Sequence, residues 1–264
     1  MLWREHHSTM TKILAVVPAR MSSSRFPGKP LEKIHGIPMI AHCYFRALHA
    51  KEISKVVLAT PDSEIIDFAS EHNIETVLTS DKHERATERA EEVLQIYKDN
   101  GEHFDYVLLL QGDEPQINPD DIDALALAIK NSDNCVVNLI HAIEGQELND
   151  ESVVKAILDV SGNILFFSRA YIPHNSNSGY RQLGMIGFTS QILHKYCELD
   201  ASSLEILESI DMMRFLENDI AISSLITDKA IIGVDHPEDI QKVELLMKND
   251  ELMKEYKYLF LKNN

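Results

Sequence analysis

The stretch ILAVVPARMSSSRFPGKPL, residues 13–31, decides the fold of this 264-residue chain. It begins with an unbroken apolar run, a pattern typical of a buried strand, and Pro18 ends that run. A Ser-rich turn follows, and it carries the cations Arg20, Arg25 and Lys29. Such a turn leaves backbone N–H groups free to face an anion. We therefore predict a polyphosphate site directly after the first strand.

The three cations suit phosphate oxygens in different ways. Arg20 and Arg25 can each donate paired hydrogen bonds to phosphate, whereas Lys29 supplies a mobile point charge. The pattern G-x-x-x-x-G-K-[ST] does not occur in the sequence, so the turn is not a Walker loop. Taken by itself, this window has an alternative interpretation as a solvated surface loop with ordinary positive residues.

Composition limits the kinds of protein that this chain can be. At 264 residues and 44% hydrophobic, it has room for one large α/β domain or for a core domain with an insertion. The formal net charge of −17 argues against general nucleic-acid binding, which needs a basic face. No apolar run approaches the ~20 residues of a membrane-spanning helix. Three cysteines without a C-x-x-C motif fit a reducing cytoplasm, where we expect the protein to reside.

Strand and helix patterns alternate through the first half of the chain. Strand patterns occupy residues 13–17, 56–60, 74–78 and 106–110, and helix patterns occupy residues 38–48, 63–71 and 84–97. This alternation predicts an α/β fold with a mainly parallel central sheet. Ligands of such sheets gather at the carboxyl ends of the strands. Asp113 follows the strand at 106–110, so it should face the same crevice as the basic turn.

The second half of the chain has a different pattern. Extended segments predominate from residue 135 to 188, and helical patterns return at about 205–216 and from 235 to 247, on either side of a strand at 220–225. We predict a single domain over residues 11–264, with residues 153–190 as an inserted extended region. Residues 1–10 are expected to form a flexible N-terminal extension.

Eight short motifs together resemble one family, the 3-deoxy-manno-octulosonate cytidylyltransferases. They occur in that family's order and span nearly the whole chain: PARMSSSRFPGKPL at 18–31, GIPMI at 36–40, ATPD at 59–62, TER at 87–89, QGDEP at 111–115, FSRAYIP at 167–173, LEILE at 204–208 and VDHPED at 234–239. A single one of these motifs would be a weak signal, whereas the ordered set is a specific one.

The resemblance implies a nucleotidyltransferase with a Rossmann-like fold. Such an enzyme uses Mg²⁺ to transfer CMP from CTP to a 2-keto sugar acid, 3-deoxy-manno-octulosonate or a related acid, and releases pyrophosphate. The product is a CMP-activated sugar for lipopolysaccharide biosynthesis. The resemblance also implies a homodimer, with its expected interface in residues 153–190.

The family's functional residues can be carried over position by position. The resemblance assigns nucleotide binding to Pro18, Ala19, Arg20, Ser23, Arg25, Lys29, Arg85, Thr87, Gln111 and Asp113. It assigns catalysis to Arg20, Lys29, Asp113 and Asp235, and Mg²⁺ to Asp113 and Asp235. It assigns the acceptor to Gln111, Arg169, Gln182, Ile186 and Glu208. The chemistry agrees with these types, because transfer to the α-phosphorus needs positioning and charge neutralisation, and Mg²⁺ prefers one or two carboxylates with phosphate oxygens and water.

Several of these residues have a purely structural alternative. Asp235 precedes His-Pro-Glu, a sequence that is also typical of a helix N-cap with a capping box. Asp113 can be a turn residue between Gly112 and Pro115. Asp62 matches a family motif too, but the cap of the following helix is an equally simple role for it.

The chain departs from the family pattern at two places. The segment HERATER, residues 83–89, has Arg85 and Ala86 where the family usually has Ser and Gly, and Gln182 and Ile186 stand where the family usually has His and Tyr. Our hypothesis is that the CTP-dependent reaction is kept while the acceptor has changed, because lost polar partners change selectivity strongly.

Two arginines then become candidates for contact with an anionic acceptor. Arg169 is a candidate carboxylate clamp, and Arg85 can pair with an anionic substrate. The alternative for Arg85 is a solvated helix cation paired with Glu88 or Glu92. At the level of the whole protein, the rivals are a sugar-phosphate or phosphonate nucleotidyltransferase and a catalytically silent binding homologue.

Overall fold

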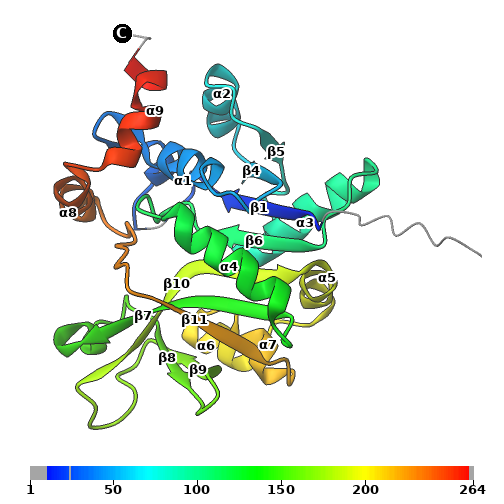
Figure 1. The fold of residues 1–264 in the computed structure, drawn as a ribbon, viewed down its shortest axis with the longest axis vertical. Coiled ribbons are helices and arrows are strands. Elements are labelled where there is room, and N and C mark those ends of the chain that lie inside the picture. The colour runs from blue at the N-terminus through cyan, green and yellow to red at the C-terminus, as the bar shows by residue number, and fades with distance from the viewer. Residues whose placement is uncertain (1–10, 24, 262–264) are drawn as a thin grey trace, which may run out of the picture.

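The computed structural model describes residues 11–23 and 25–261 (Figure 1). The strands are β1 (Ile13–Pro18), β2 (Lys33–Ile34), β3 (Ile37–Pro38), β4 (Lys55–Thr60), β5 (Thr76–Leu78), β6 (Tyr106–Leu110), β7 (Val136–Glu144), β8 (Lys155–Leu158), β9 (Asn163–Ser168), β10 (Ser178–Thr189) and β11 (Ile222–Thr227). The α-helices are α1 (Met39–Leu48), α2 (Ser63–Glu71), α3 (Ala86–Asp99), α4 (Pro119–Asn131), α5 (Ser190–Glu198), α6 (Ser203–Glu208), α7 (Met213–Glu217), α8 (Pro237–Met247) and α9 (Glu251–Leu261). Two 3₁₀ turns are η1 (Lys29–Leu31) and η2 (Gly145–Asn149).

One large sheet organises the molecule. Its strands lie in the order β5-β4-β1-β6-β10-β7-β11-β9-β8, and β2 pairs with β3 separately. β4 and β6 both run parallel to β1, and β5 runs parallel to β4. β10 is antiparallel to β6 and β7, whereas β11 is parallel to β7. The predicted α/β fold is therefore confirmed, with its parallel strands concentrated in the first half of the chain.

The sheet is buried on both faces, because residues of each central strand alternate between two apolar cores. In β1, Ile13, Ala15 and Val17 belong to the core that includes side chains of α1, α2, α4, α8 and α9. Leu14 and Val16 belong to the core that includes side chains of α3, α5 and α7. This burial explains why β1 is apolar throughout rather than alternating with polar residues.

The first half of the chain follows the sequence prediction closely, and the second half follows it less well. The helix expected over 205–216 is two short helices, α6 and α7, because Ser209 ends α6 in a left-handed conformation with φ 55°. Helices α4, α5 and α9 were not predicted. In region 153–190, β8 and β9 lie at the sheet edge, but β10 pairs with β6 in the middle of the sheet, so this region is continuous with the main core.

Two further expectations concern the ends of the chain and membranes. Residues 1–10, expected to be a flexible extension, lie outside the described residues. Across residues 11–23 and 25–261, none of the helices combines the length and the apolar character that a bilayer crossing requires.

Candidate active site

A pocket of about 360 Å³ opens where β1 and β6 end. The sequence-predicted residues that line it are Pro18, Ala19, Arg20, Ser23, Arg25, Lys29, Arg85, Gln111, Asp113 and Asp235. The turn after β1 and the turn after β6 therefore share one crevice, as expected for the carboxyl ends of neighbouring parallel strands.

Gly112 allows the two strand ends to approach this closely. A Cβ at Gly112 would lie 2.5 Å from the carbonyl oxygen of Pro18 and 2.7 Å from Cδ1 of Ile40. Because any side chain would collide with backbone there, glycine is required between Gln111 and Asp113. Gly184 has a similar role, since a Cβ on it would collide with the Gln111 side chain.

Backbone and side-chain hydrogen bonds fix the turn after β1. The Ala19 amide donates to the Ala59 carbonyl at 2.9 Å, and the Met21 amide donates to Asp62 Oδ2 at 2.7 Å. Gly28, with φ 77°, donates its amide to the Met21 carbonyl and closes the turn. The expectation that Asp62 caps the following helix is wrong, because its side chain makes no cap hydrogen bond to α2. The Asp62 side chain holds the basic turn instead.

Two ion pairs join the basic turn to the two aspartates. Lys29 Nζ lies 2.8 Å from Asp113 Oδ2 and also donates to the Val234 carbonyl at 2.8 Å. Arg25 Nη1 lies 3.4 Å from Asp235 Oδ1. The Val234 amide donates to the Asp113 carbonyl at 2.9 Å, which ties the two acidic segments together. Charged side chains that are far apart in the sequence, from Arg25 to Asp235, therefore meet in one cluster.

Asp235 does not cap the helix that follows it. His236 is the N-cap residue of α8, and the Asp239 carboxylate accepts from the amides of Asp235 and His236 at 3.1 and 3.0 Å. The carboxylate of Asp239 does the capping, so the Asp235 side chain is left to face the pocket. This removes the structural alternative for Asp235.

Glu114 supports the site from behind. It is buried, and its Oε1 accepts from the Gly184 amide at 2.8 Å. Its Oε2 has no hydrogen-bond partner among residues 11–23 and 25–261. Burial, reinforced by the charge of Asp113, raises the pKa of Glu114 to about 7. This carboxyl group holds β10 against the turn that carries Asp113.

A second wall of the pocket comes from the start of α3 and from the link between α6 and α7. Sequence reasoning assigned no site role to its members His83, Arg89 and Asp211, or to Ser22 and Met39 elsewhere in the lining. The TER motif at 87–89 was the available signal for Arg89. Nothing marked Asp211, since it lies in a link that the sequence pattern predicts as continuous helix.

Thr87 and Arg89 make hydrogen bonds that hold this second wall in place. Thr87 is buried and does not line the pocket, but its Oγ1 donates to Asp211 Oδ2 at 2.6 Å. Burial raises the pKa of Asp211. Arg89 donates to the Thr79 hydroxyl and to the Ser80 carbonyl, so its guanidinium is held by the segment that follows β5.

The structure contradicts the interpretation of Arg85 as a solvated cation paired with Glu88 or Glu92. Its Nε lies 3.2 Å from Glu205 Oε1, on α6, and its side chain is only 23% exposed. Glu92 instead pairs with His83, at 2.6 Å. The Arg85 side chain therefore links the start of α3 to α6.

Four expected acceptor residues lie outside the pocket lining, namely Arg169, Gln182, Ile186 and Glu208. Arg169 donates its backbone amide to Glu208 Oε2 at 2.9 Å and Nε to the Glu208 carbonyl at 3.0 Å. Gln182 donates to Asn138 Oδ1 at 2.7 Å. Ile186, 2% exposed, is a core residue because it lies on β10 between β6 and β7. Of the expected acceptor set, Gln111 is in the lining.

Comparison with known proteins gives consistent matches. The family model described as cytidylyltransferase matches residues 14–224. A 3-deoxy-manno-octulosonate cytidylyltransferase from Protochlamydia amoebophila is 35% identical over 248 residues, which are 90% of this chain and 95% of that protein. The Zea mays protein of the same description is 32% identical, over 94% of this chain and 85% of its own length.

Solved structures agree with these sequence matches. The structure of a CMP:2-keto-3-deoxy-manno-octonic acid synthetase complexed with CTP has a TM-score of 0.83 and 33% identity, and the match covers 91% of this chain and 100% of that one. A cytidylyltransferase from Leptospira borgpetersenii has a TM-score of 0.62 at 14% identity, with 96% and 98% of the two chains covered, a likeness that concerns the fold alone.

Proposed function

This chain belongs to the 3-deoxy-manno-octulosonate cytidylyltransferase family, and from this premise we propose that it transfers CMP from CTP to 3-deoxy-manno-octulosonate, or a closely related sugar acid, with release of pyrophosphate. The observation that carries the proposal is the convergence of Arg20, Arg25 and Lys29 with Asp113 and Asp235 in a single pocket. A triphosphate needs cations, and a metal–nucleotide complex needs carboxylates as well.

The proposed roles follow from the chemistry of the transfer. The acceptor hydroxyl oxygen attacks the α-phosphorus of CTP, and the bond from that phosphorus to the pyrophosphate oxygen breaks. Negative charge therefore grows on the departing oxygens. Lys29, held between Asp113 and the Val234 carbonyl, and the guanidinium groups of Arg20 and Arg25 are proposed to stabilise this charge.

We propose that Asp113 and Asp235 hold the Mg²⁺ that this chemistry requires. The donor set fits, because Mg²⁺ takes one or two carboxylates together with phosphate oxygens and water. Among residues 11–23 and 25–261, no cluster of three or more His, Cys, Asp or Glu side chains offers a complete protein site. Two pocket carboxylates completed by the nucleotide are therefore the fitting arrangement. When bound, the ion would neutralise phosphate charge and orient the α-phosphorus.

A second candidate function differs only in the acceptor. Arg169, Gln182, Ile186 and Glu208 do not line the pocket, so the contacts expected for 3-deoxy-manno-octulosonate are not assembled there. This observation favours another anionic acceptor, a different ulosonic acid or a sugar phosphate, as the runner-up. A homodimer and a cytoplasmic location are further parts of the proposal, and light scattering in solution tests the first of them.

Pyrophosphate release tests the proposed function. Purified protein is incubated with CTP, Mg²⁺ and 3-deoxy-manno-octulosonate, next to a panel of other sugar acids and sugar phosphates. Asp113→Asn should lower kcat/KM about 100-fold or more, because it removes charge at the proposed metal position. Asp120→Asn is the matched control, since Asp120 is 86% exposed and pairs with Lys229 outside the pocket.

The outcomes separate the candidates. Turnover of 3-deoxy-manno-octulosonate that depends on Asp113 supports the proposal, and turnover of another acceptor alone supports the runner-up. A protein that releases no pyrophosphate with any acceptor would refute both. An Asp113→Asn variant as active as wild type would refute the proposed role of Asp113 in holding the metal.

A further inference from the structure

Arg85 lines the pocket, and its guanidinium has only loose partners. Besides the 3.2 Å contact from Nε to Glu205 Oε1, its Nη2 lies 3.4 Å from the Glu205 carbonyl oxygen and its Nη1 lies 3.4 Å from Ser209 Oγ. Hydrogen bonds between a guanidinium and a carboxylate are normally about 2.7–2.9 Å long. The contact of Arg85 with the Glu205 carboxylate is longer than this range, and its two 3.4 Å contacts exceed the roughly 2.7–3.2 Å of ordinary N–H···O hydrogen bonds.

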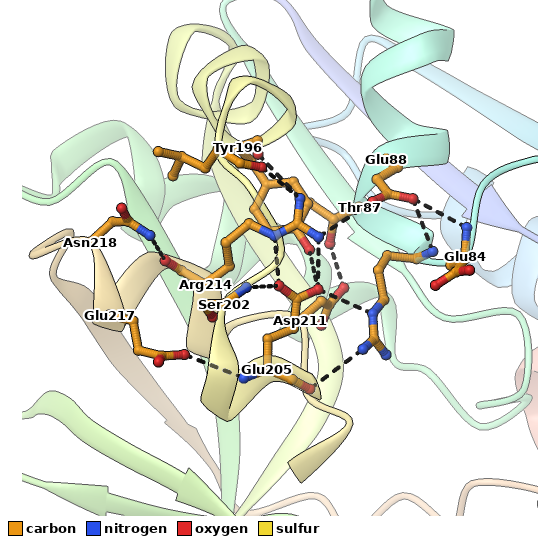
Figure 2. Close-up of polar contacts among 12 residues, drawn as sticks. Glu84, Thr87, Glu88, Tyr196, Ser202, Glu205, Asp211, Arg214, Glu217 and Asn218 are labelled. Atoms are coloured by element: carbon orange, nitrogen blue, oxygen red, sulfur yellow. Dashed lines mark hydrogen bonds and ion pairs between the residues drawn. The ribbon is translucent and has the colours of Figure 1, made fainter. Parts of the chain in front are cut away.

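The carboxylate of Glu205, which Arg85 approaches, is already paired with Arg214, and Figure 2 shows this second pair. Arg214 donates Nε to Glu205 Oε2 at 2.6 Å and Nη2 to Glu205 Oε1 at 2.8 Å. Its guanidinium also lies over the Tyr196 ring, 4.0 Å from the centroid. Glu205 is 1% exposed, so this paired arrangement is what compensates its buried charge.

Release of Arg85 from α6 would therefore leave no buried charge unpaired. Breaking a buried ion pair is costly chiefly because one charge remains without a partner. Here Glu205 would keep both short bonds to Arg214, and Arg85 would still face the pocket. Arg85 can exchange its contacts with α6 for a better ligand at small cost.

The reaction partners indicate which ligand that is. The charge of CTP resides in its triphosphate, for which the turn after β1 supplies Arg20, Arg25 and Lys29. The remaining anionic group in the proposed reaction is the carboxylate of the acceptor. Arg169, the expected clamp, is outside the pocket lining and donates Nη1 to the Glu151 carbonyl at 3.1 Å.

Resting on the proposed function, we infer that Arg85 binds the carboxylate of the acceptor acid and determines the preference for an acid over a neutral sugar. A guanidinium matches a carboxylate with two parallel hydrogen bonds. Asp211, on the same wall, offers a hydrogen-bond acceptor for the acceptor's hydroxyl groups.

The test compares an acid with its neutral ester. Steady-state kinetics are measured for wild type and Arg85→Ser with the preferred sugar acid, with its methyl ester and with varied CTP. Serine is a favoured N-cap residue, so α3 should still begin normally. We expect kcat/KM for the acid to fall about 10- to 100-fold, the effect of losing hydrogen bonds to a charged group. The values for the ester and the KM for CTP should change less than about threefold, and Arg85→Lys should restore part of the acid preference.

Lys55→Ser is the matched control. The Lys55 side chain is also 23% exposed and pairs with Glu75 and Glu102 at 3.1 Å each, but it lies outside the pocket lining. This variant should leave the acid-to-ester ratio unchanged.

Two results would overturn the inference alone. An equal loss for acid and ester would make Arg85 a strut between α3 and α6, and a rise confined to the KM for CTP would make it a nucleotide contact. Failure of wild type to turn over any sugar acid would instead overturn the proposed function, and this inference with it.

Discussion

Gly112→Ala is the substitution that most directly tests how the strand ends form the site. The new methyl group would lie 2.5 Å from the Pro18 carbonyl oxygen and 2.7 Å from Ile40 Cδ1. Ordinary van der Waals contact begins at 3.4 Å, so one of the two strand ends has to move by about 0.9 Å. The Pro18 oxygen belongs to the backbone at the end of β1, so it cannot rotate away as a side chain would. The movement therefore displaces either the basic turn or Asp113.

Both stability and activity should respond, and by different amounts. Inserting a methyl group into a packed interior typically costs about 1–3 kcal/mol. A misplacement of about 1 Å at a catalytic group can cost about 100-fold in rate. We therefore expect Gly112→Ala to remain folded at low temperature, with kcat/KM for pyrophosphate release lowered about 100-fold.

Urea unfolding and steady-state kinetics measure these two effects on the same preparation. Gly233→Ala is the control, because a Cβ there meets nothing within 4 Å and the residue has no left-handed φ, although it lies two residues before Asp235. A Gly112→Ala enzyme within twofold of wild-type kcat/KM, or a Gly233→Ala enzyme equally impaired, would refute the reasoning.

Three further substitutions have definite expected outcomes. Gly184→Ala should lower kcat/KM about 10-fold in the pyrophosphate assay, because it pushes the Gln111 side chain, which can yield more easily than backbone. Lys155→Met should lower the free energy of unfolding in urea by about 3 kcal/mol, since buried Lys155 donates to three backbone carbonyl groups. Burial lowers the pKa of His42 from 6.5 to about 4, so the unfolded chain binds the extra proton between these values. The free energy of unfolding should therefore fall by about 3 kcal/mol as the pH drops from 6.5 toward 4, because protonation of His42 favours the unfolded chain. His42→Gln should flatten that part of the pH dependence of unfolding.

The sequence was most informative where a local rule connects pattern to position. The apolar run of β1 and the cations after it predicted both a buried strand and the wall of the pocket, because ligands gather at the carboxyl ends of parallel strands. The same rule placed Asp113 in the same crevice as the basic turn, and the structure shows Asp113 paired with Lys29 at 2.8 Å, although 84 residues separate them. Long sequence separation is no obstacle when both residues follow neighbouring strands.

Prediction failed where several weak local choices decide the structure. One left-handed residue, Ser209, divides the helix expected over 205–216, and it thereby directs Asp211 into the pocket. Ile186 stands at a position that the resemblance assigns to the acceptor, but its place on a central strand buries its side chain in the core. A position in a motif specifies where a residue lies along the chain, whereas burial depends on the strands that pair with it.

Arg85, the proposed acceptor contact, shows why the acceptor half of such a site is harder to predict than the phosphate half. The cations proposed to bind phosphate lie one turn beyond a strand, so the sheet itself fixes them. The partner of Arg85 is 120 residues away on a six-residue helix that belongs to no strand end. Its position depends on the pairing of Glu205 with Arg214 and on the packing of α7 against the far core. Under this proposal, specificity is set by contacts among short elements, which can change while the sheet and the basic turn after β1 stay the same.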